Sequence, residues 1–123
     1  RVTRSPLPEF ETFPRVHARY VTFPSHDGYT LRARIVAPPD MEPGKVYPVL
    51  IGNVYSGTVL NQWTSPRPIS LLQQWLAHGR GYVSVQVDLR GSVGYGVKFR
   101  EAFQGDWGGG ALEDLHATVG GLK

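Results

Sequence analysis

The stretch from Tyr82 to Gly96 constrains the fold most strongly, because it passes from a strand pattern into a glycine-rich loop. Between 83 and 87 valines alternate with polar residues, which is the period of a pleated strand, and β-branched side chains favour that backbone. The strand pattern stops at Asp88, and glycines follow at 91, 94 and 96. In open α/β sheets, chemistry gathers at the carboxyl ends of strands. Asp88 and the loop after it are therefore the first candidates for a functional position.

The glycines of this loop do not match a phosphate-binding fingerprint. Their order is G-x-x-G-x-G, the reverse of the dinucleotide pattern, and G-x-x-x-x-G-K-[ST] does not occur in the chain. The simpler interpretation is a tight connection whose glycines let backbone segments pack closely. In this interpretation Asp88 and Arg90 form a local ion pair.

Composition excludes several classes of function. The 123 residues suffice for one modest domain, and the net charge of +3 is scattered, so no nucleic-acid partner is predicted. The absence of cysteine excludes disulfides and a cysteine nucleophile. No apolar run approaches the roughly 20 residues that span a bilayer. The histidines lack metal-ligand spacing, so we predict no metal and no cofactor. Compartment and oligomeric state stay open.

Before the central stretch, an arm and a hairpin are predicted. Residues 1–14 contain three prolines and read as an extended arm. Residues 19–23 and 30–37 alternate in polarity around the turn signal at 27–28, which predicts an antiparallel hairpin at the margin of a sheet. Arg32 and Arg34 would lie on its solvated face, and His26 would be an exposed turn residue.

A strand, helix and strand follow the hairpin and predict a right-handed βαβ unit with parallel strands. The strand at 47–54 holds an unbroken apolar run, which indicates cover on both faces. The helix at 66–78 would begin after an N-cap at Ser65 and end at Gly79 and Gly81. With no strand after it in the chain, the strand at 82–88 would lack one neighbour, so an isolated piece would be marginally stable or would associate.

The last part of the chain predicts two helical segments. Phe99 and Phe103 mark a short first piece. Apolar residues at 112, 115, 119 and 122 fall at helical spacing and mark the second helix. Glu113 and Asp114 would lie in its first turn, where carboxylates interact favourably with the helix dipole. A further strand would be the next element.

No complete catalytic set is present. The nucleophile elbow G-x-S-x-G is absent, and neither Ser56 nor Ser92 has glycines at the required offsets on both sides. His78 closes a helix, where a favourable dipole interaction explains it. Tyr55 ends a strand and opens the loop before the first helix, where α/β hydrolases build part of an oxyanion hole. A packed aromatic at a strand end is the alternative interpretation of Tyr55.

Four segments, in order, carry a resemblance to a known family: VTFPSHDG at 21–28, YPVLIGNVYSG at 47–57, GYVSVQVDLRGSVGYG at 81–96, and GDWGG with ED at 105–114. From about Leu7 to Lys123 the chain resembles the beginning of the catalytic domain of the prolyl oligopeptidase family of serine peptidases, which includes dipeptidyl and acylaminoacyl peptidases. The resemblance implies the first half of an α/β-hydrolase fold, an antiparallel hairpin followed by a parallel βαβ unit. Residues 1–17 would be a linker from a preceding β-propeller, and 18–123 a partial catalytic domain that ends before the nucleophile elbow.

The same resemblance implies a function. The complete protein would hydrolyse peptide bonds through an acyl-enzyme, with a Ser-Asp-His triad beyond this chain and a peptide or small ester as substrate. The hydroxyl of Tyr55 would donate to the oxyanion. Two alternatives stay open: an esterase-like α/β hydrolase, and a non-catalytic fragment or interaction module.

Overall fold

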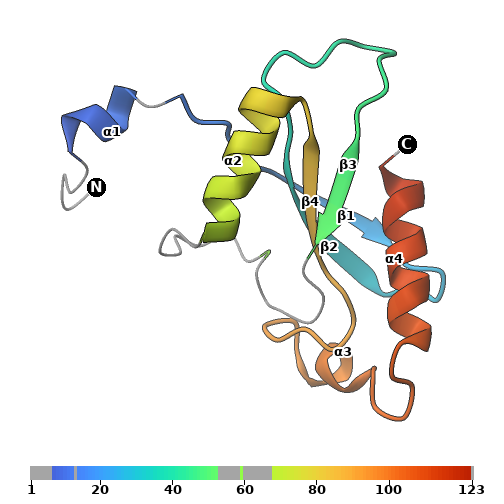
Figure 1. Ribbon diagram of the computed structural model, residues 1–123. Coiled ribbons are helices and arrows are strands. Elements are labelled where there is room, and N and C mark those ends of the chain that lie inside the picture. The colour runs from blue at the N-terminus through green and yellow to red at the C-terminus, as the bar shows by residue number, and fades with distance from the viewer. Residues whose placement is uncertain (1–6, 13, 53–58, 60–67, 123) are drawn as a thin grey trace.

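A mixed four-stranded sheet forms the centre of the computed structural model, which describes residues 7–12, 14–52, 59 and 68–122. Figure 1 shows α2 on one side of the sheet and α4 on the other. The strands are β1 Arg19–Pro24, β2 Thr30–Val36, β3 Val49–Gly52 and β4 Val83–Asp88; the helices are α1 Pro8–Thr12, α2 Pro68–Arg80, α3 Val97–Glu101 and α4 Gly109–Gly121. This arrangement confirms the predicted partial α/β fold.

The strand order is β1-β2-β4-β3, with β1 antiparallel to β2, β2 antiparallel to β4, and β3 parallel to β4. Both the predicted hairpin and the predicted parallel βαβ unit are thereby confirmed. The prediction that the strand at 82–88 lacks a neighbour is wrong, because β4 pairs on both of its edges. The parallel crossover places β3 outside β4, so the open edges belong to β1 and β3.

The core lies between the sheet and α4. The inward residues of β2 and β4 alternate along each strand, as a pleat requires, and are buried together with Leu89, Phe99 and Ala111. On the opposite face, Arg34 donates through Nη1 to Gln73 of α2 at 2.9 Å and to Gln86 of β4 at 3.0 Å. The prediction that Arg34 lies on a solvated face is therefore wrong, since α2 covers that side of β2 and β4.

The predicted cover of the strand at 47–54 is also wrong. The observed β3 is shorter, and Val49 and Leu50 are 49% and 45% exposed. An apolar run predicts burial only if neighbours cover both faces, and α2 packs on β4 and β2 instead. Residues 53 and 54 lie outside the described part of the chain.

The helices differ from prediction mainly at their ends. The arm is not wholly extended, because α1 forms one short helix within it. α2 continues through Gly79 and ends at Arg80, and the next residue, Gly81, has φ +68°. Only Gly81 needs the left-handed conformation that favours glycine, so only Gly81 ends the helix. The predicted N-cap at Ser65 lies outside the described residues.

Further along, α4 buries only part of its predicted apolar face, because Leu115 and Leu122 pack half-buried against the core and the other two positions do not. Leu112 and Val119 are 51% and 43% exposed, whereas Ala111, Asp114 and Thr118 are buried. These three residues share one face of the helix at the expected spacing. Small and polar side chains therefore let α4 lie close to the sheet, and a charged residue is among those it buries.

Candidate functional site

Asp88 ends β4 with a fully buried carboxylate. Its Oδ2 accepts a hydrogen bond from the Tyr95 hydroxyl at 2.6 Å and one from the backbone N–H of Val59 at 3.0 Å. The first bond ties the glycine-rich loop to the carboxyl end of β4. The second ties down the connection between β3 and α2 at the same place. Asp88 thus joins two loops at the edge where open α/β sheets carry their chemistry.

Tyr95 keeps its proton in this arrangement. Burial, and then the hydrogen bond to Asp88, raise the pKa of Tyr95 above its ordinary value. The Tyr95 ring also packs edge-on against Phe99, with centroids 5.2 Å apart. A neutral phenol of fixed orientation can donate steadily, so the hydrogen bond from Tyr95 to Asp88 persists through the neutral pH range.

Arg90 makes no bond to Asp88, so the predicted local ion pair is wrong. The Arg90 guanidinium instead forms two forked contacts. Nε and Nη2 donate to the two oxygens of Asp114 at 2.9 and 2.7 Å, and Nη1 and Nη2 donate to the two oxygens of Asp27 at 2.8 and 3.1 Å. Planar, bidentate pairing of this kind is the strong form of an arginine–carboxylate contact. Because Asp114 and Asp27 together engage all three guanidinium nitrogens, Arg90 pairs with them and not with Asp88.

Two further donors complete the environment of Asp114. The backbone N–H of Arg90 donates to Oδ2 at 3.0 Å, and the Ser25 hydroxyl donates to Oδ1 at 2.6 Å. Burial alone would raise the pKa of Asp114, but the hydrogen bonds from Arg90 and Ser25 outweigh it and hold that pKa below its usual value. Asp114 is therefore ionised inside the protein. We call Ser25, Asp27, Arg90 and Asp114 the Arg90 cluster.

The Arg90 cluster joins three separate parts of the chain: the hairpin turn, the loop after β4, and α4. The hydrogen bond from Arg90 lowers the pKa of Asp27, and hydrogen bonds with Asp114 and then Asp27 raise the pKa of Arg90 against the effect of burial. All three groups thus stay charged at neutral pH. The role of the cluster is to hold the glycine-rich loop, and with it Tyr95, against the sheet.

The approach of α4 to this cluster depends on Gly110. A Cβ at that position would lie 2.8 Å from Nη1 and 2.9 Å from Cδ of Arg90. The start of α4 is held in turn by Asp106, whose Oδ2 accepts the Gly110 N–H at 2.7 Å. The glycines at the start of α4 therefore allow close packing against Arg90 and a helix start that a carboxylate anchors.

Comparison with known proteins relates this chain to one family of peptidases. The sequence profile of the prolyl oligopeptidase family matches residues 69–122. The chain is 34% identical over 113 residues to dipeptidyl peptidase 8 of Homo sapiens, covering 89% of this chain and 12% of that protein. It is 29% identical over 106 residues to dipeptidyl-peptidase 5 of Schizosaccharomyces pombe, covering 84% of this chain and 15% of that protein. These matches support the prolyl oligopeptidase family of serine peptidases.

The fold agrees with that family. The crystal structure of Porphyromonas gingivalis dipeptidyl peptidase 4 superposes with a TM-score of 0.75 over 93% of this chain and 16% of that one, at 24% identity. This likeness concerns the fold, which is that of an α/β hydrolase in part. The chain spans less than a fifth of the length of each of these three proteins.

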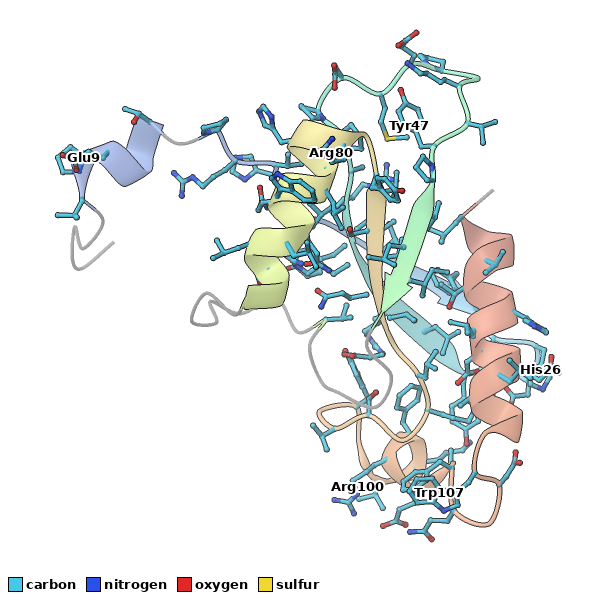
Figure 2. All side chains as sticks on the ribbon, in the orientation of Figure 1. Glu9, His26, Tyr47, Arg80, Arg100 and Trp107 are labelled. Carbon is cyan, nitrogen blue, oxygen red and sulfur yellow. The ribbon has the colours of Figure 1, made fainter. Side chains whose placement is uncertain are left out.

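The residues that the sequence singled out have different outcomes in the structure. Tyr55 and Ser56 lie outside the described residues, so the predicted oxyanion donor stays a prediction. Ser92 is fully buried, and its hydroxyl has no hydrogen-bond partner in the described part of the chain. His26 is exposed, as predicted, and Figure 2 shows it at the hairpin turn beside α4. His78 lies in the last turn of α2, as predicted, and is exposed.

Neither a metal-binding group nor a membrane-spanning helix occurs among the described residues. No His, Asp or Glu side chains of residues 7–12, 14–52, 59 and 68–122 gather in a group of three that could hold a metal ion. Over the same ranges, no helix has both the length and the apolar character needed to cross a membrane.

Sequence reasoning missed the importance of Ser25, Asp27 and Asp114. Asp114 was predicted only to be an acid in the first turn of a helix, where it interacts with the helix dipole. A usable signal did exist, because Gly110, Ala111, Asp114 and Thr118 form a stripe of small and polar residues at helical spacing. A stripe of that kind indicates close helix packing around one polar contact, and Arg90 supplies the matching charge.

Proposed function

We propose that this chain forms part of the catalytic domain of a serine peptidase, which cleaves peptide bonds through an acyl-enzyme. The support is that relatives aligned along 84% and 89% of this chain are dipeptidyl peptidases. No nucleophile elbow occurs among the 123 residues. The proposal therefore assigns the Ser-Asp-His triad to residues outside this chain. Residues 1–17 are assigned to a linker from a β-propeller, and 18–123 to the catalytic domain.

Within this proposal Tyr55 supplies one donor of the oxyanion hole. It lies three residues after Gly52, the end of β3, and four before Val59, which Asp88 holds. Because each residue adds at most about 3.6 Å of reach, Tyr55 stays within roughly 14 Å of Val59. In this proposal, its hydroxyl therefore acts near the carboxyl ends of β3 and β4.

The chemistry of acyl transfer explains why a hydroxyl at this edge matters. Attack on the substrate carbonyl places negative charge on its oxygen, and a donor already in position lowers that barrier without reorganising. In the proposed mechanism Tyr55 donates to this oxygen. Asp88 acts as a positioning residue in this proposal, because it holds Val59, which lies four residues after Tyr55 in the chain.

Tyr55→Phe in the complete protein tests this assignment. Turnover of a dipeptidyl substrate should fall by about 10²–10³ in kcat, the usual effect of removing one oxyanion donor, while the melting temperature should change little. Tyr82→Phe is the matched control, since Tyr82 is partly exposed at the start of β4. An unchanged kcat in Tyr55→Phe would remove Tyr55 from the oxyanion hole.

The chain by itself should show no turnover, because its sequence contains no serine elbow. A fluorophosphonate probe that labels active serine hydrolases should react with the complete protein and not with residues 1–123 alone. Labelling of the complete protein without peptide cleavage, but with ester cleavage, would favour an esterase. No labelling would favour a non-catalytic module, and peptide turnover by the isolated chain would contradict the proposal.

A further inference from the structure

A shallow basic hollow lies at the hairpin end of the sheet, beside the loop that Asp88 holds. Its volume is about 250 Å³, and its lining includes Tyr29 and Arg32 from the hairpin, Tyr95 from the glycine-rich loop, and Lys98 and Phe99 from α3. Because drug-sized ligands usually occupy pockets of roughly 300–1,000 Å³, a hollow of this size suits a smaller molecule.

Three aromatic rings form a continuous wall in this hollow. Phe99 packs edge-on against Tyr29, with centroids 5.8 Å apart, and against Tyr95, with centroids 5.2 Å apart. A cation stands at each end of the wall. Arg32 Cζ lies 4.6 Å from the centroid of the Tyr95 ring, and Lys98 Nζ lies 5.7 Å from that of Tyr29. The hollow thus combines an apolar surface with two positive charges.

Both cations are available to an anion. Neither Arg32 nor Lys98 forms an ion pair with a carboxylate among the described residues. Two acids lie close by, and neither forms an ion pair with Arg32 or Lys98: Asp27 binds Arg90, and Oδ2 of Asp88 accepts hydrogen bonds from Tyr95 and Val59. The cationic groups that line the hollow therefore face it without a neutralising acid in the lining.

We propose that this hollow binds a small carboxylate that carries an aromatic or apolar group. The planar guanidinium of Arg32 matches a carboxylate, and Lys98 adds a second charge-assisted donor. The ring wall would take the apolar part of the ligand. Since Tyr95 both lines the hollow and holds Asp88, the site adjoins the edge where the proposed oxyanion donor acts. The binding itself does not depend on the peptidase proposal.

Calorimetric titration of the complete protein with N-benzoylglycine tests the proposal. This ligand combines a planar carboxylate with an aromatic ring. N-benzoylglycinamide is the matched probe, because it keeps the ring and loses the charge. The acid should bind saturably, and the amide should bind at least about tenfold more weakly, because a charge-assisted hydrogen bond is lost. Equal affinity for both probes, or no saturable binding of the acid, would overturn the proposal.

Variants then locate the binding. Arg32→Gln and Lys98→Gln should each weaken binding of N-benzoylglycine by about tenfold. Arg100→Gln is the control on the same helix, because Arg100 is exposed, pairs with Glu101 and does not line the hollow. Should Arg32→Gln fail to fold, the exposed Lys98 decides the question. Unchanged affinity in Lys98→Gln, or an equal loss in Arg100→Gln, would contradict the assignment.

The same titration identifies the source of the carboxylate. It could come from a free small acid or from the C-terminus of a short peptide. A dipeptide ending in phenylalanine and its C-terminal amide distinguish these sources. Competition between the dipeptide acid and N-benzoylglycine, with none from the dipeptide amide, would assign the hollow to peptide C-termini. Binding of N-benzoylglycine without such competition would assign it to free small acids.

Discussion

Among single residues, Arg90 constrains the packing most, because its charge is buried and needs charged partners. Asp114 provides most of these contacts: its two carboxylate oxygens accept hydrogen bonds from the Arg90 guanidinium and from the Arg90 backbone N–H. A buried ion pair adds less stability than its geometry suggests, because both charges lose their hydration. Removing one partner is costly, because the other charge is then left uncompensated. The cluster therefore specifies how α4 sits more than it adds to stability.

Asp114→Asn should lower the free energy of unfolding by about 3 kcal/mol at neutral pH, since Arg90 would keep only Asp27 as a charged partner. Urea denaturation measures the loss. Glu113→Gln is the matched control, because Glu113 is the exposed neighbour of Asp114 on the same helix. A loss no larger than that of the control would mean that Asp27 alone satisfies Arg90.

The stability of the wild-type protein and that of Asp114→Asn should depend differently on pH. The pKa values of Asp114 and Asp27 are lowered in the folded state, so their contribution is complete above the unfolded value of about 3.9 and is lost as pH falls through the folded values. The stability gap between wild type and Asp114→Asn should therefore be constant near neutral pH and shrink below about pH 4. Denaturation curves at several pH values measure it, and a gap that widens in acid would contradict this account.

Among the elements, α4 shows most clearly how one position controls packing. Alanine is usually the better helix residue by about 1 kcal/mol, so glycine-to-alanine changes inside helices tend to stabilise. At Gly120 a Cβ would meet nothing within 4 Å, whereas at Gly110 it would meet Arg90. Because two carboxylates hold Arg90 in place, its side chain cannot yield easily.

Gly110→Ala should therefore lower the melting temperature, and Gly120→Ala should leave it unchanged or raise it. Thermal unfolding followed by circular dichroism compares the two variants directly. Both changes occur in the same helix and add the same methyl group, so helix propensity cancels between them. Equal effects would mean that α4 can shift away from the Arg90 cluster without cost.

In the molecule as a whole, the open edge of β3 carries Val49 and Leu50, both exposed. An apolar edge strand with unpaired backbone groups is a template for pairing with another chain. Leu112 and Val119 of α4 add further exposed apolar surface. The chain on its own is therefore expected to associate, through β3 and not through β4.

Sedimentation velocity should show that the average mass of the chain rises with concentration. Leu50→Lys should suppress the rise, because a charged residue at an edge strand opposes pairing. Val46→Lys is the control, since Val46 is 94% exposed in the loop before β3. A strictly monomeric wild type at high concentration would contradict the expectation, and equal suppression by both variants would point to net charge instead of the edge.

Apart from the short helix α1, the sequence alone determined the local elements and their order. Alternation at 83–87 and at 30–37 predicted β4 and β2, and the turn signal at 27–28 predicted the connection of β2 to β1, because backbone periodicity and turn chemistry are short-range properties. The resemblance to the prolyl oligopeptidase family was also readable from its motifs. For the candidate site, the sequence indicated Asp88 and its loop, but not what they bind.

Only the tertiary structure decided the partners and the buried faces. Asp27, Arg90 and Asp114 are far apart in the chain, so their pairing depends on how α4 and the hairpin turn pack against the loop after β4. The exposure of Val49 and Leu50 depends on which strand lies at the edge, and that follows from the crossover. Burial and charge pairing arise between segments distant in sequence, so no local pattern could specify them.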